Sequence, residues 1–320
     1  MPDRGAVVPD EVLTTDLGPG WDRWRSRLPR LAEELLQEWG LRLDGPTAAG
    51  LTAVVLPVRD ADGRPAALKV GWPHPEAEHE HLALRAWAGR GAVRLLRADP
   101  GRSALVLERA DAGTDLSVLP AVEACAVVGE LYGVLHRPAL PQLRRLSVLA
   151  DDWARRLRAL EQHPQVPRRF VVQAVAHLGE LASLPSTDGT LVHTDLHYAN
   201  VLASLREPEA QPGVRGDGPP SDSWLAIDPK PLSGDPAYEV APLLWNRADE
   251  LRGYGTVRDG LLDRFYAVVD AAGLDEDRAR AWVVVRGMVN VLWAVEDADG
   301  GPPDAAWLTG QTTMIKAMIP

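Results

Sequence analysis

Strand-like patterns are concentrated in the first part of this chain, whereas long helical patterns fill most of the rest. Residues 51–71 (LTAVVLPVRDADGRPAALKVG) predict a hairpin of two strands around an Asp-Gly turn. Residues 92–110 (AVRLLRADPGRSALVLERA) predict two more strands joined by a Pro-Gly turn. Residues 119–185 and 236–320 carry apolar residues mostly at helical spacing. We therefore expect an α+β fold in which a small antiparallel β-sheet lobe precedes a larger, mostly helical lobe.

Two helices are predicted within the first lobe. Apolar residues recur at helical spacing from Trp21 to Trp39, and Pro29 is expected to mark a start or a break in that helix. A second helix is expected within residues 75–91, where Leu84 and Trp87 fall on one stripe. Together with the strands, these segments predict a sheet of about five strands with one main helix.

The change in pattern also predicts where the lobes begin and end. We expect a first lobe over residues 1–109, a linker over 110–118 and a second lobe over 119–320. Residues 204–221 are rich in Pro and Gly, which predicts a flexible surface insertion. The chain shows no internal repeat.

Composition excludes several classes of function. With 46% hydrophobic residues, 25% charged residues and a net charge of −11, the chain is typical of a soluble globular protein and a poor partner for nucleic acid. Its acidity suits a cationic small substrate. A single cysteine, Cys125, excludes an internal disulfide framework and a cysteine-based zinc site. The apolar stretch 281–297 contains Arg286 and is too short to span a bilayer, and the N-terminus lacks a signal-peptide pattern, so we expect a cytoplasmic protein without a membrane partner.

The segment LVHTDLHYANVL, residues 191–202, concentrates polar side chains between two apolar flanks. His193, Asp195 and Asn200 match the spacing H-x-D-x-x-x-x-N of a phosphoryl-transfer loop. This chemistry needs a carboxylate at the acceptor hydroxyl and, nearby, an amide oxygen on a magnesium ion. The spacing therefore predicts Asp195 as the base and Asn200 as a metal ligand.

A second acidic group is expected at the end of a later strand. In WLAIDPKP, Asp228 follows an apolar run and precedes Pro229, so we expect extended backbone at this position. An exposed carboxylate at a strand end is suited to bind a metal ion. Asp228 is the expected second magnesium ligand.

Lysine is rare in this chain, which makes each lysine informative. Only Lys69, Lys230 and Lys316 occur, and Lys69 lies between apolar residues of a predicted strand. This position is similar to the strand lysine that holds the α- and β-phosphates of a nucleotide. Glu80 shares a helix face with Leu84 and Trp87, so it is expected to point inward and pair with Lys69.

A different reading of the loop is a metal centre. His193, Asp195 and His197 alternate, and on a continuous strand their side chains would share one face and could bind zinc or iron. That reading leaves Asn200, Asp228 and Lys69 unexplained. In the phosphoryl-transfer reading, the two histidines are structural and fix the loop by hydrogen bonds.

Together, these segments resemble the aminoglycoside phosphotransferases, in particular the branch of streptomycin 6-kinases and hydroxyurea phosphotransferases. The stretches that carry the resemblance are LVHTDLHYANVLA, WLAIDPKPLSGDPAYEVAPLLWNR, GRGAVRLLRAD and LWAVEDADG. The resemblance extends from about Trp21 to Trp293 and beyond. It implies a protein-kinase-like bilobal fold that uses ATP and Mg²⁺ to phosphorylate a hydroxyl of a small molecule.

The resemblance also implies roles for individual residues. Asp195 would be the catalytic base, Asn200 and Asp228 would bind magnesium, and Asp235 would brace the catalytic loop. The segment Leu107–Asp111 would be the hinge that offers backbone groups to adenine. The residues expected to contact the nucleotide are Lys69, Glu80, Gly45, Gly50, Thr52, Glu108 and Ala110.

The late stretch VLWAVEDADG is expected to line the acceptor site. Glu296 and Asp297 would match ammonium groups of a cationic substrate, and Trp293 would offer an aromatic face. The expected acceptor is an aminoglycoside of streptomycin type, which would make the chain an antibiotic-resistance enzyme. The alternatives are a kinase for another metabolite, such as an amino sugar or hydroxyurea, and an inactive binding protein of the same fold.

Overall fold

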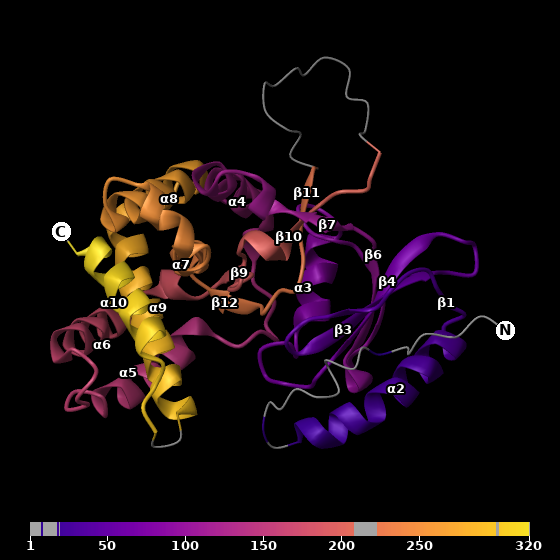
Figure 1. Ribbon diagram of the computed structural model, residues 1–320, viewed down its shortest axis with the longest axis horizontal. Helices are drawn as coiled ribbons and strands as arrows, with labels where there is room; N and C mark the ends of the chain where they lie inside the picture. The colour runs from indigo at the N-terminus through magenta and orange to yellow at the C-terminus, as the bar shows by residue number, and fades with distance from the viewer. Residues whose placement is uncertain (1–7, 9–17, 19, 208–222, 299–300, 320) are drawn as a thin grey trace, which may run out of the picture.

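The computed structural model describes residues 8, 18, 20–207, 223–298 and 301–319 of the 320-residue chain. A lobe built around a β-sheet contains the first part of the chain, and a larger lobe of helices contains the rest (Figure 1). The predicted α+β class with two lobes is confirmed. Most of the predicted insertion at 204–221 lies outside the described residues.

The first lobe contains a 6-stranded antiparallel sheet. Its strands lie in the order β1-β3-β4-β6-β5, and β2 pairs with β3. The predicted hairpin is formed by β3 and β4, whose register pairs Arg59 with Pro65 across the Asp-Gly turn. The bounds are β1 (Arg42–Leu43), β2 (Ala48–Ala49), β3 (Ala53–Arg59), β4 (Pro65–Gly71), β5 (Leu95–Asp99) and β6 (Ala104–Glu108).

The helix α2 (Trp21–Glu38) covers one face of this sheet (Figure 1). Its buried side chains, among them Trp21, Leu28 and Leu35, share a core with alternate residues of β3 and β4. The expectation that Pro29 starts or breaks this helix is wrong, because α2 runs through Pro29 without interruption. Proline removes one backbone hydrogen bond from a helix. Burial of Leu28 before Pro29 and of Leu35 after it holds both halves of α2 on the sheet.

The helix α3 (Glu80–Trp87) begins five residues later than the predicted segment 75–91 and packs toward the second lobe. Leu84 and Trp87 are fully buried, in the same core as the helical lobe. The indole N–H of Trp87 donates to the carbonyl of Leu135 at 2.7 Å. This contact ties the main helix of the first lobe to the second lobe.

The chain enters the second lobe through a strand. After β6 ends at Glu108, β7 (Asp111–Asp115) pairs with β10 (Val201–Ala203), which in turn pairs with β11 (Trp224–Ala226). The expected linker 110–118 thus contains a strand of a small sheet. A further small sheet has the order β12-β9-β8, with β8 (Arg137–Pro138), β9 (Thr190–Val192) and β12 (Leu232–Gly234).

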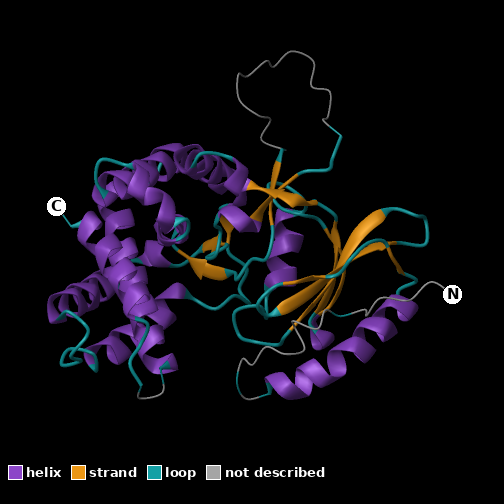
Figure 2. Cartoon of the chain, in the orientation of Figure 1, coloured by secondary structure: helices purple, strands orange, loops and turns teal. Residues whose placement is uncertain are grey.

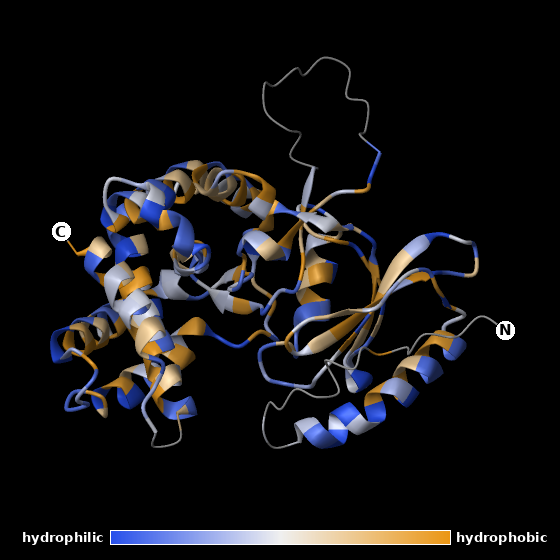
Figure 3. Ribbon diagram, viewed as in Figure 1, coloured by the Kyte–Doolittle hydropathy of each residue, from blue (hydrophilic) through white to orange (hydrophobic). Residues whose placement is uncertain are grey.

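Helices make up most of the second lobe, with the small sheets between them and the first lobe (Figure 2). Hydrophobic and hydrophilic residues alternate around these helices (Figure 3), and the buried hydrophobic side chains of the lobe form one core. Among the described residues, no helix is both long enough and apolar enough to cross a membrane. The bounds are α4 (Ala121–Leu135), α5 (Leu146–Arg158), α6 (Arg168–Ala182), α7 (Ala241–Trp245), α8 (Val257–Ala272), α9 (Glu276–Asp297) and α10 (Ala305–Met318).

Candidate active site

The polar segment after β9 forms a compact loop that returns into β10. The amide of Asn200 donates from Nδ2 to the carbonyl of Asp195 at 2.8 Å, and its backbone N–H donates to the carbonyl of His197 at 2.9 Å. These bonds close the loop on itself. The amide oxygen of Asn200 remains available, because its nitrogen is the atom that holds the loop.

Thr194 has an unusual backbone conformation, with φ of 67°. A β-branched residue in the left-handed region is strained by about 1–3 kcal/mol, so neighbouring groups must hold it. The backbone N–H of Thr194 donates to Glu239 at 2.7 Å, its hydroxyl donates to the carbonyl of Lys230 at 2.7 Å, and its carbonyl accepts from Arg286 at 3.2 Å. The backbone and side chain of Thr194, directly before Asp195, are therefore held by three different residues.

His193 is fully buried and stacks against Trp87 with 6.0 Å between ring centroids. Its Nε2 bonds to the carbonyl of Ile227 at 2.9 Å, and its Nδ1 lies 3.3 Å from the backbone nitrogen of Asp195. Burial lowers the pKa of His193, which favours the neutral ring. With both ring nitrogens engaged, His193 cannot ligate a metal. The alternative metal centre is not formed: the described part of the chain holds no group of three metal-ligating side chains.

Asp228 follows β11, as predicted, but its backbone is not extended. Its φ is 55°, so the expectation drawn from the following proline is wrong. Aspartate tolerates the left-handed region better than most residues. In this conformation, the carboxylate of Asp228 reaches the ammonium group of Lys69, and its Oδ1 lies 2.5 Å from Nζ.

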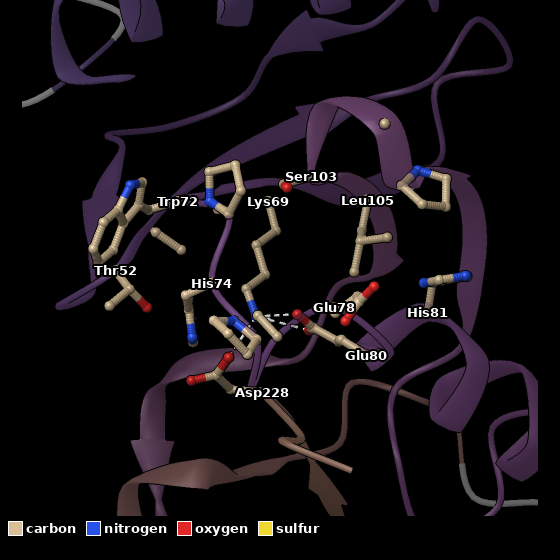
Figure 4. Close-up of a pocket in the computed structure, with 17 residues that line it drawn as sticks. Thr52, Lys69, Trp72, His74, Glu78, Glu80, His81, Ser103, Leu105 and Asp228 are labelled. Atoms are coloured by element: carbon tan, nitrogen blue, oxygen red, sulfur yellow. Dashed lines mark hydrogen bonds and ion pairs between the residues drawn. The ribbon is translucent and has the colours of Figure 1, made fainter. Parts of the chain in front are cut away.

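The predicted ion pair between Lys69 and Glu80 is present and buried. Nζ of Lys69 lies 2.7 Å from both carboxylate oxygens of Glu80, and Figure 4 shows the ammonium group between Glu80 and Asp228. Burial would lower the pKa of Lys69, but the two carboxylates outweigh it and raise the pKa well above its usual range. Burial would likewise raise the pKa of Asp228, yet the charge of Lys69 lowers it to about 2. Lys69 and Asp228 are therefore charged at neutral pH, whereas burial raises the pKa of Glu80 against the opposing effect of Lys69.

A large cleft of about 1360 Å³ joins Lys69 and Asp228 to the polar loop. Lys69 from β4, Asp195 and Asn200 from the loop and Asp228 after β11 all line it. The other predicted residues that line this cleft are Gly45, Gly50, Thr52, Glu108, Ala110 and Asp297.

The predicted hinge lies along this cleft, and Glu108 faces a cation there. Its carboxylate accepts from Arg206, with bonds of 2.7 and 2.6 Å, and from the backbone N–H of Arg94 at 2.9 Å. Only the backbone of this residue can therefore serve a ligand without breaking an ion pair. Ala110, two residues after Glu108, is buried directly before β7 begins.

A second cavity, of about 600 Å³, is also lined by Asp195. Aromatic side chains from several helices wall it, and Trp293 is among them. Glu296 does not line this cavity, and both of its carboxylate oxygens accept hydrogen bonds from Arg156. The remaining aromatic and charged residues that line it are Trp153, Tyr238, Trp245, Trp307, Glu76, Arg144, Asp152, Arg156, Lys230 and Arg286.

Asp235 is buried but does not brace the loop as expected. Its carboxylate accepts from Arg278 at 2.6 Å, from the indole N–H of Trp282 and from the backbone of Ala237. It therefore fixes the first turns of α9. The carboxylate that holds the loop belongs to Glu239, which is fully buried and also lies 2.6 Å from His136.

Residues that sequence reasoning did not place at the site are Lys230, Glu239 and Arg286. The sequence could have indicated a role for Lys230, because lysine is rare in this chain and Lys230 follows Asp228 by two positions. It could not have indicated roles for Glu239 and Arg286, because each lies far along the chain from the loop that it contacts.

Comparisons with known proteins show the family of this chain. The family of aminoglycoside/hydroxyurea antibiotic resistance kinases matches residues 38–298. A hydroxyurea phosphotransferase of Kitasatospora aureofaciens is 41% identical, over 94% of this chain and 84% of its own length. A streptomycin 6-kinase of Streptomyces glaucescens is 37% identical, over 88% of both chains.

Solved structures share the fold at lower identity. A choline/ethanolamine kinase family protein from Mesorhizobium loti superposes with a TM-score of 0.59 at 18% identity, covering 90% of this chain and 94% of its own. An aminoglycoside phosphotransferase in complex with ADP and hygromycin B gives a TM-score of 0.56 at 19% identity, covering 89% and 97%. From the family match and the similarity along most of its length, the chain belongs to the aminoglycoside/hydroxyurea antibiotic resistance kinases.

Proposed function

We propose that this kinase transfers the γ-phosphoryl group of ATP to a hydroxyl of a small molecule, and that the acceptor is an aminoglycoside of streptomycin type. The observation that carries the proposal is the convergence of Lys69, Asp195, Asn200 and Asp228 on one cleft. These groups come from distant parts of the chain and supply the cation, the carboxylates and the amide oxygen that phosphoryl transfer needs. Because it consumes ATP, the reaction belongs in the cytoplasm.

In this proposal the nucleotide lies in the larger cleft. Lys69, held by Glu80, contacts the α- and β-phosphates, and its fixed ammonium group matches their charge. Adenine lies against the backbone of Glu108 and Ala110, so the segment 110–118 serves as the hinge between lobes 1–109 and 119–320. Gly45, Gly50 and Thr52 line the cleft where a covering loop would contact the phosphates.

Asn200 and Asp228 fit the role of magnesium ligands. Both offer oxygen atoms, the kind of ligand that Mg²⁺ prefers. Asn200 uses its nitrogen on Asp195, which leaves its oxygen available, and the described contacts of Asp228 engage Oδ1. When bound, the ion would neutralise charge on the β- and γ-phosphates. Ile227 donates its backbone N–H to the carbonyl of Asn200 at 2.9 Å, so the two ligands lie on adjacent backbone segments.

Asp195 acts as the base. It lines both the nucleotide cleft and the second cavity, so a hydroxyl bound in that cavity can reach its carboxylate. The carboxylate orients the hydroxyl and receives its proton as the new bond to phosphorus forms.

The second cavity is the acceptor site in this proposal. A volume of about 600 Å³ lies within the range of pockets for drug-sized ligands and favours an aminoglycoside over a molecule as small as hydroxyurea. Trp293 offers an aromatic face to a cationic group. Asp297 lines the larger cleft and not this cavity, so an ammonium group of the acceptor would have to extend out of the cavity to meet its carboxylate. Both carboxylate oxygens of Glu296 are already occupied by Arg156.

An acceptor screen tests the function. Purified protein is incubated with ATP and Mg²⁺, separately with streptomycin, other aminoglycosides, amino sugars and hydroxyurea. ADP formation is measured by a coupled assay, and the product is checked by mass spectrometry for one added phosphoryl group. We expect acceptor-dependent turnover with streptomycin. ATP binding without transfer to any acceptor would instead indicate a binding protein of the same fold.

A further inference from the structure

Lys230 makes a direct contact with the proposed base. Its ammonium group donates to Oδ2 of Asp195, and the side chains are 29% and 23% exposed. One carboxylate oxygen of Asp195 is therefore occupied by a cation, and Oδ1 is the oxygen that can face an acceptor hydroxyl. Partly exposed ion pairs contribute little to the stability of a protein, so stability alone does not explain this pair.

The backbone of Lys230 is fixed to the same loop. Its N–H donates to the carbonyl of His193 at 3.0 Å, and its carbonyl accepts from the hydroxyl of Thr194 at 2.7 Å. Prolines at 229 and 231 restrict the chain on both sides. Only the four-carbon stem of the side chain can move, so the ammonium group has a short and defined range.

The position of Lys230 relative to the two cavities is distinctive. Lys69 and Arg109 are the other lysine and arginine at the larger cleft, and the second cavity has arginines of its own. Within the described ranges, Lys230 is the one lysine or arginine that lines both cavities. If the nucleotide occupies the larger cleft and the acceptor the second cavity, the transferred phosphoryl group must pass between the two cavities.

The two lysines at the larger cleft have different partners. The ammonium group of Lys230 pairs with Asp195. Lys69, by contrast, is committed to Glu80 and Asp228. Negative charge that develops away from Lys69 therefore needs a different cation.

We propose that Lys230 is a catalytic residue, which holds Asp195 in the free enzyme and contacts the γ-phosphoryl group of ATP during transfer. This inference rests on the proposed function. The acceptor oxygen forms a bond to the γ-phosphorus, the bond from phosphorus to the bridging oxygen breaks, and ADP leaves with that electron pair. The acceptor proton passes to Asp195. Lys230 stabilises the charge on the non-bridging oxygens, which is greatest in the transition state.

The test compares Lys230→Met and Lys230→Arg with Lys316→Met, a control at an exposed lysine on α10. Lys230→Met should lower kcat by about 10²–10³-fold, the range found when one donor to a developing charge is removed. Lys230→Arg should recover part of that loss, since it keeps a positive charge. Lys316→Met should behave as the wild type.

Nucleotide affinity separates direct contact from mere positioning of Asp195. Lys230→Met should weaken binding of a non-hydrolysable ATP analogue by roughly tenfold or more, as expected for loss of a charge-assisted hydrogen bond. Its affinity for ADP, which lacks the γ-phosphate, should stay unchanged. Equal affinities of variant and wild type for the analogue, or an unchanged kcat, would overturn the proposal.

The same measurements distinguish the failure of this inference from failure of the proposed function. If the wild type binds the analogue and phosphorylates an acceptor while Lys230→Met does so equally well, only the role of Lys230 is wrong. If the wild type binds no nucleotide, the proposed function fails and the role of Lys230 fails with it. A variant that loses ADP affinity as well points to a disturbed fold and contradicts a role specific to the γ-phosphate.

Discussion

At the scale of single residues, the site combines strained backbone with buried ion pairs. Thr194 and Asp228 both have positive φ, and each contributes to the catalytic cleft or its support. Such conformations persist only where surrounding contacts hold them. Here Glu239 and Lys230 hold Thr194, and Lys69 holds Asp228.

Replacement of the proposed base should separate chemistry from binding. In Asp195→Asn, the amide cannot accept the acceptor proton, so kcat should fall by about 10²–10⁴-fold. The dissociation constant for ATP should change little, because Lys69 and the proposed metal ligands Asn200 and Asp228 remain. Steady-state kinetics with titration calorimetry checks both quantities. Wild-type kcat in the variant would show that Asp195 is not the base.

The acceptor-binding carboxylate can be identified with a matched pair of variants. Asp297→Asn should raise KM for a cationic acceptor and weaken the dependence of KM on salt, while KM for ATP stays unchanged. Glu296→Gln should have the smaller effect, since Arg156 already neutralises Glu296. If neither KM changes, or if an uncharged acceptor is turned over equally well, the acceptor is not recognised by its positive charge.

Buried His193 should make stability depend on pH. Its pKa is lowered from about 6.5 in the folded protein, so the unfolded chain binds the proton first. Its contribution is complete above pH 6.5 and is lost as the pH falls below that value, by up to about 1.4 kcal/mol per pH unit. Urea unfolding between pH 7.5 and 5.5 should show a smaller decline for His193→Asn than for the wild type. Parallel curves would rule out this histidine as a source of the pH dependence.

At the scale of secondary-structure elements, close helix packing supports the catalytic lobe. The helices α4 and α8 approach at Gly129, where an added Cβ would lie 2.6 Å from Cβ of Ala271 and 2.8 Å from the carbonyl oxygen of Val268. The neighbouring atoms include backbone, which cannot easily move away. Gly133 lies on the same helix with no atom within 4 Å of the corresponding position.

These two glycines make a controlled test of that packing. Gly129→Ala should lower the free energy of unfolding by about 1–3 kcal/mol, because overpacking outweighs the better helix propensity of alanine. Gly133→Ala should raise it by up to about 1 kcal/mol. Chemical denaturation of both variants measures the two values. Stabilisation by Gly129→Ala would contradict the close approach of α4 and α8.

At the scale of the whole molecule, the cleft joins the two lobes through charge. Lys69 belongs to the sheet of the first lobe, and Asp228 follows a strand of the second. A nucleotide bound in this cleft would contact both lobes. It should therefore stabilise the whole protein rather than one part of it.

Thermal unfolding with nucleotide tests this coupling. At a fixed concentration of one hundred times the dissociation constant of the wild type, ATP with Mg²⁺ should add about 2.7 kcal/mol to the free energy of unfolding of the wild type. Asp228→Asn should lose most of this gain while keeping the ion pair between Lys69 and Glu80. The comparison is made within each protein, with and without nucleotide, so a lower Tm of the variant alone does not affect it. An equal gain in both proteins would remove Asp228 from the nucleotide site.

Part of this protein follows from its sequence because the relevant contacts are local. The hairpin of β3 and β4 follows from alternating apolar residues around an Asp-Gly turn, and the loop from His193 to Asn200 closes on itself. Lys69 and Glu80 are only 11 residues apart, and helix periodicity alone turns Glu80 inward. Such features need only short-range geometry, and the structure contains them.

Other features were decided only when distant segments packed together. The contacts of Thr194 with Glu239, of Asp195 with Lys230 and of Asp235 with α9 join residues more than thirty positions apart, as the separations of 45, 35 and 43 show. Two local rules also gave way to tertiary contacts. Pro29 does not interrupt α2, because buried residues on both sides bind it to the sheet, and Asp228 adopts positive φ where its carboxylate meets Lys69. Local preferences amount to a few kcal/mol at most, and burial and ion pairing of comparable size can override them.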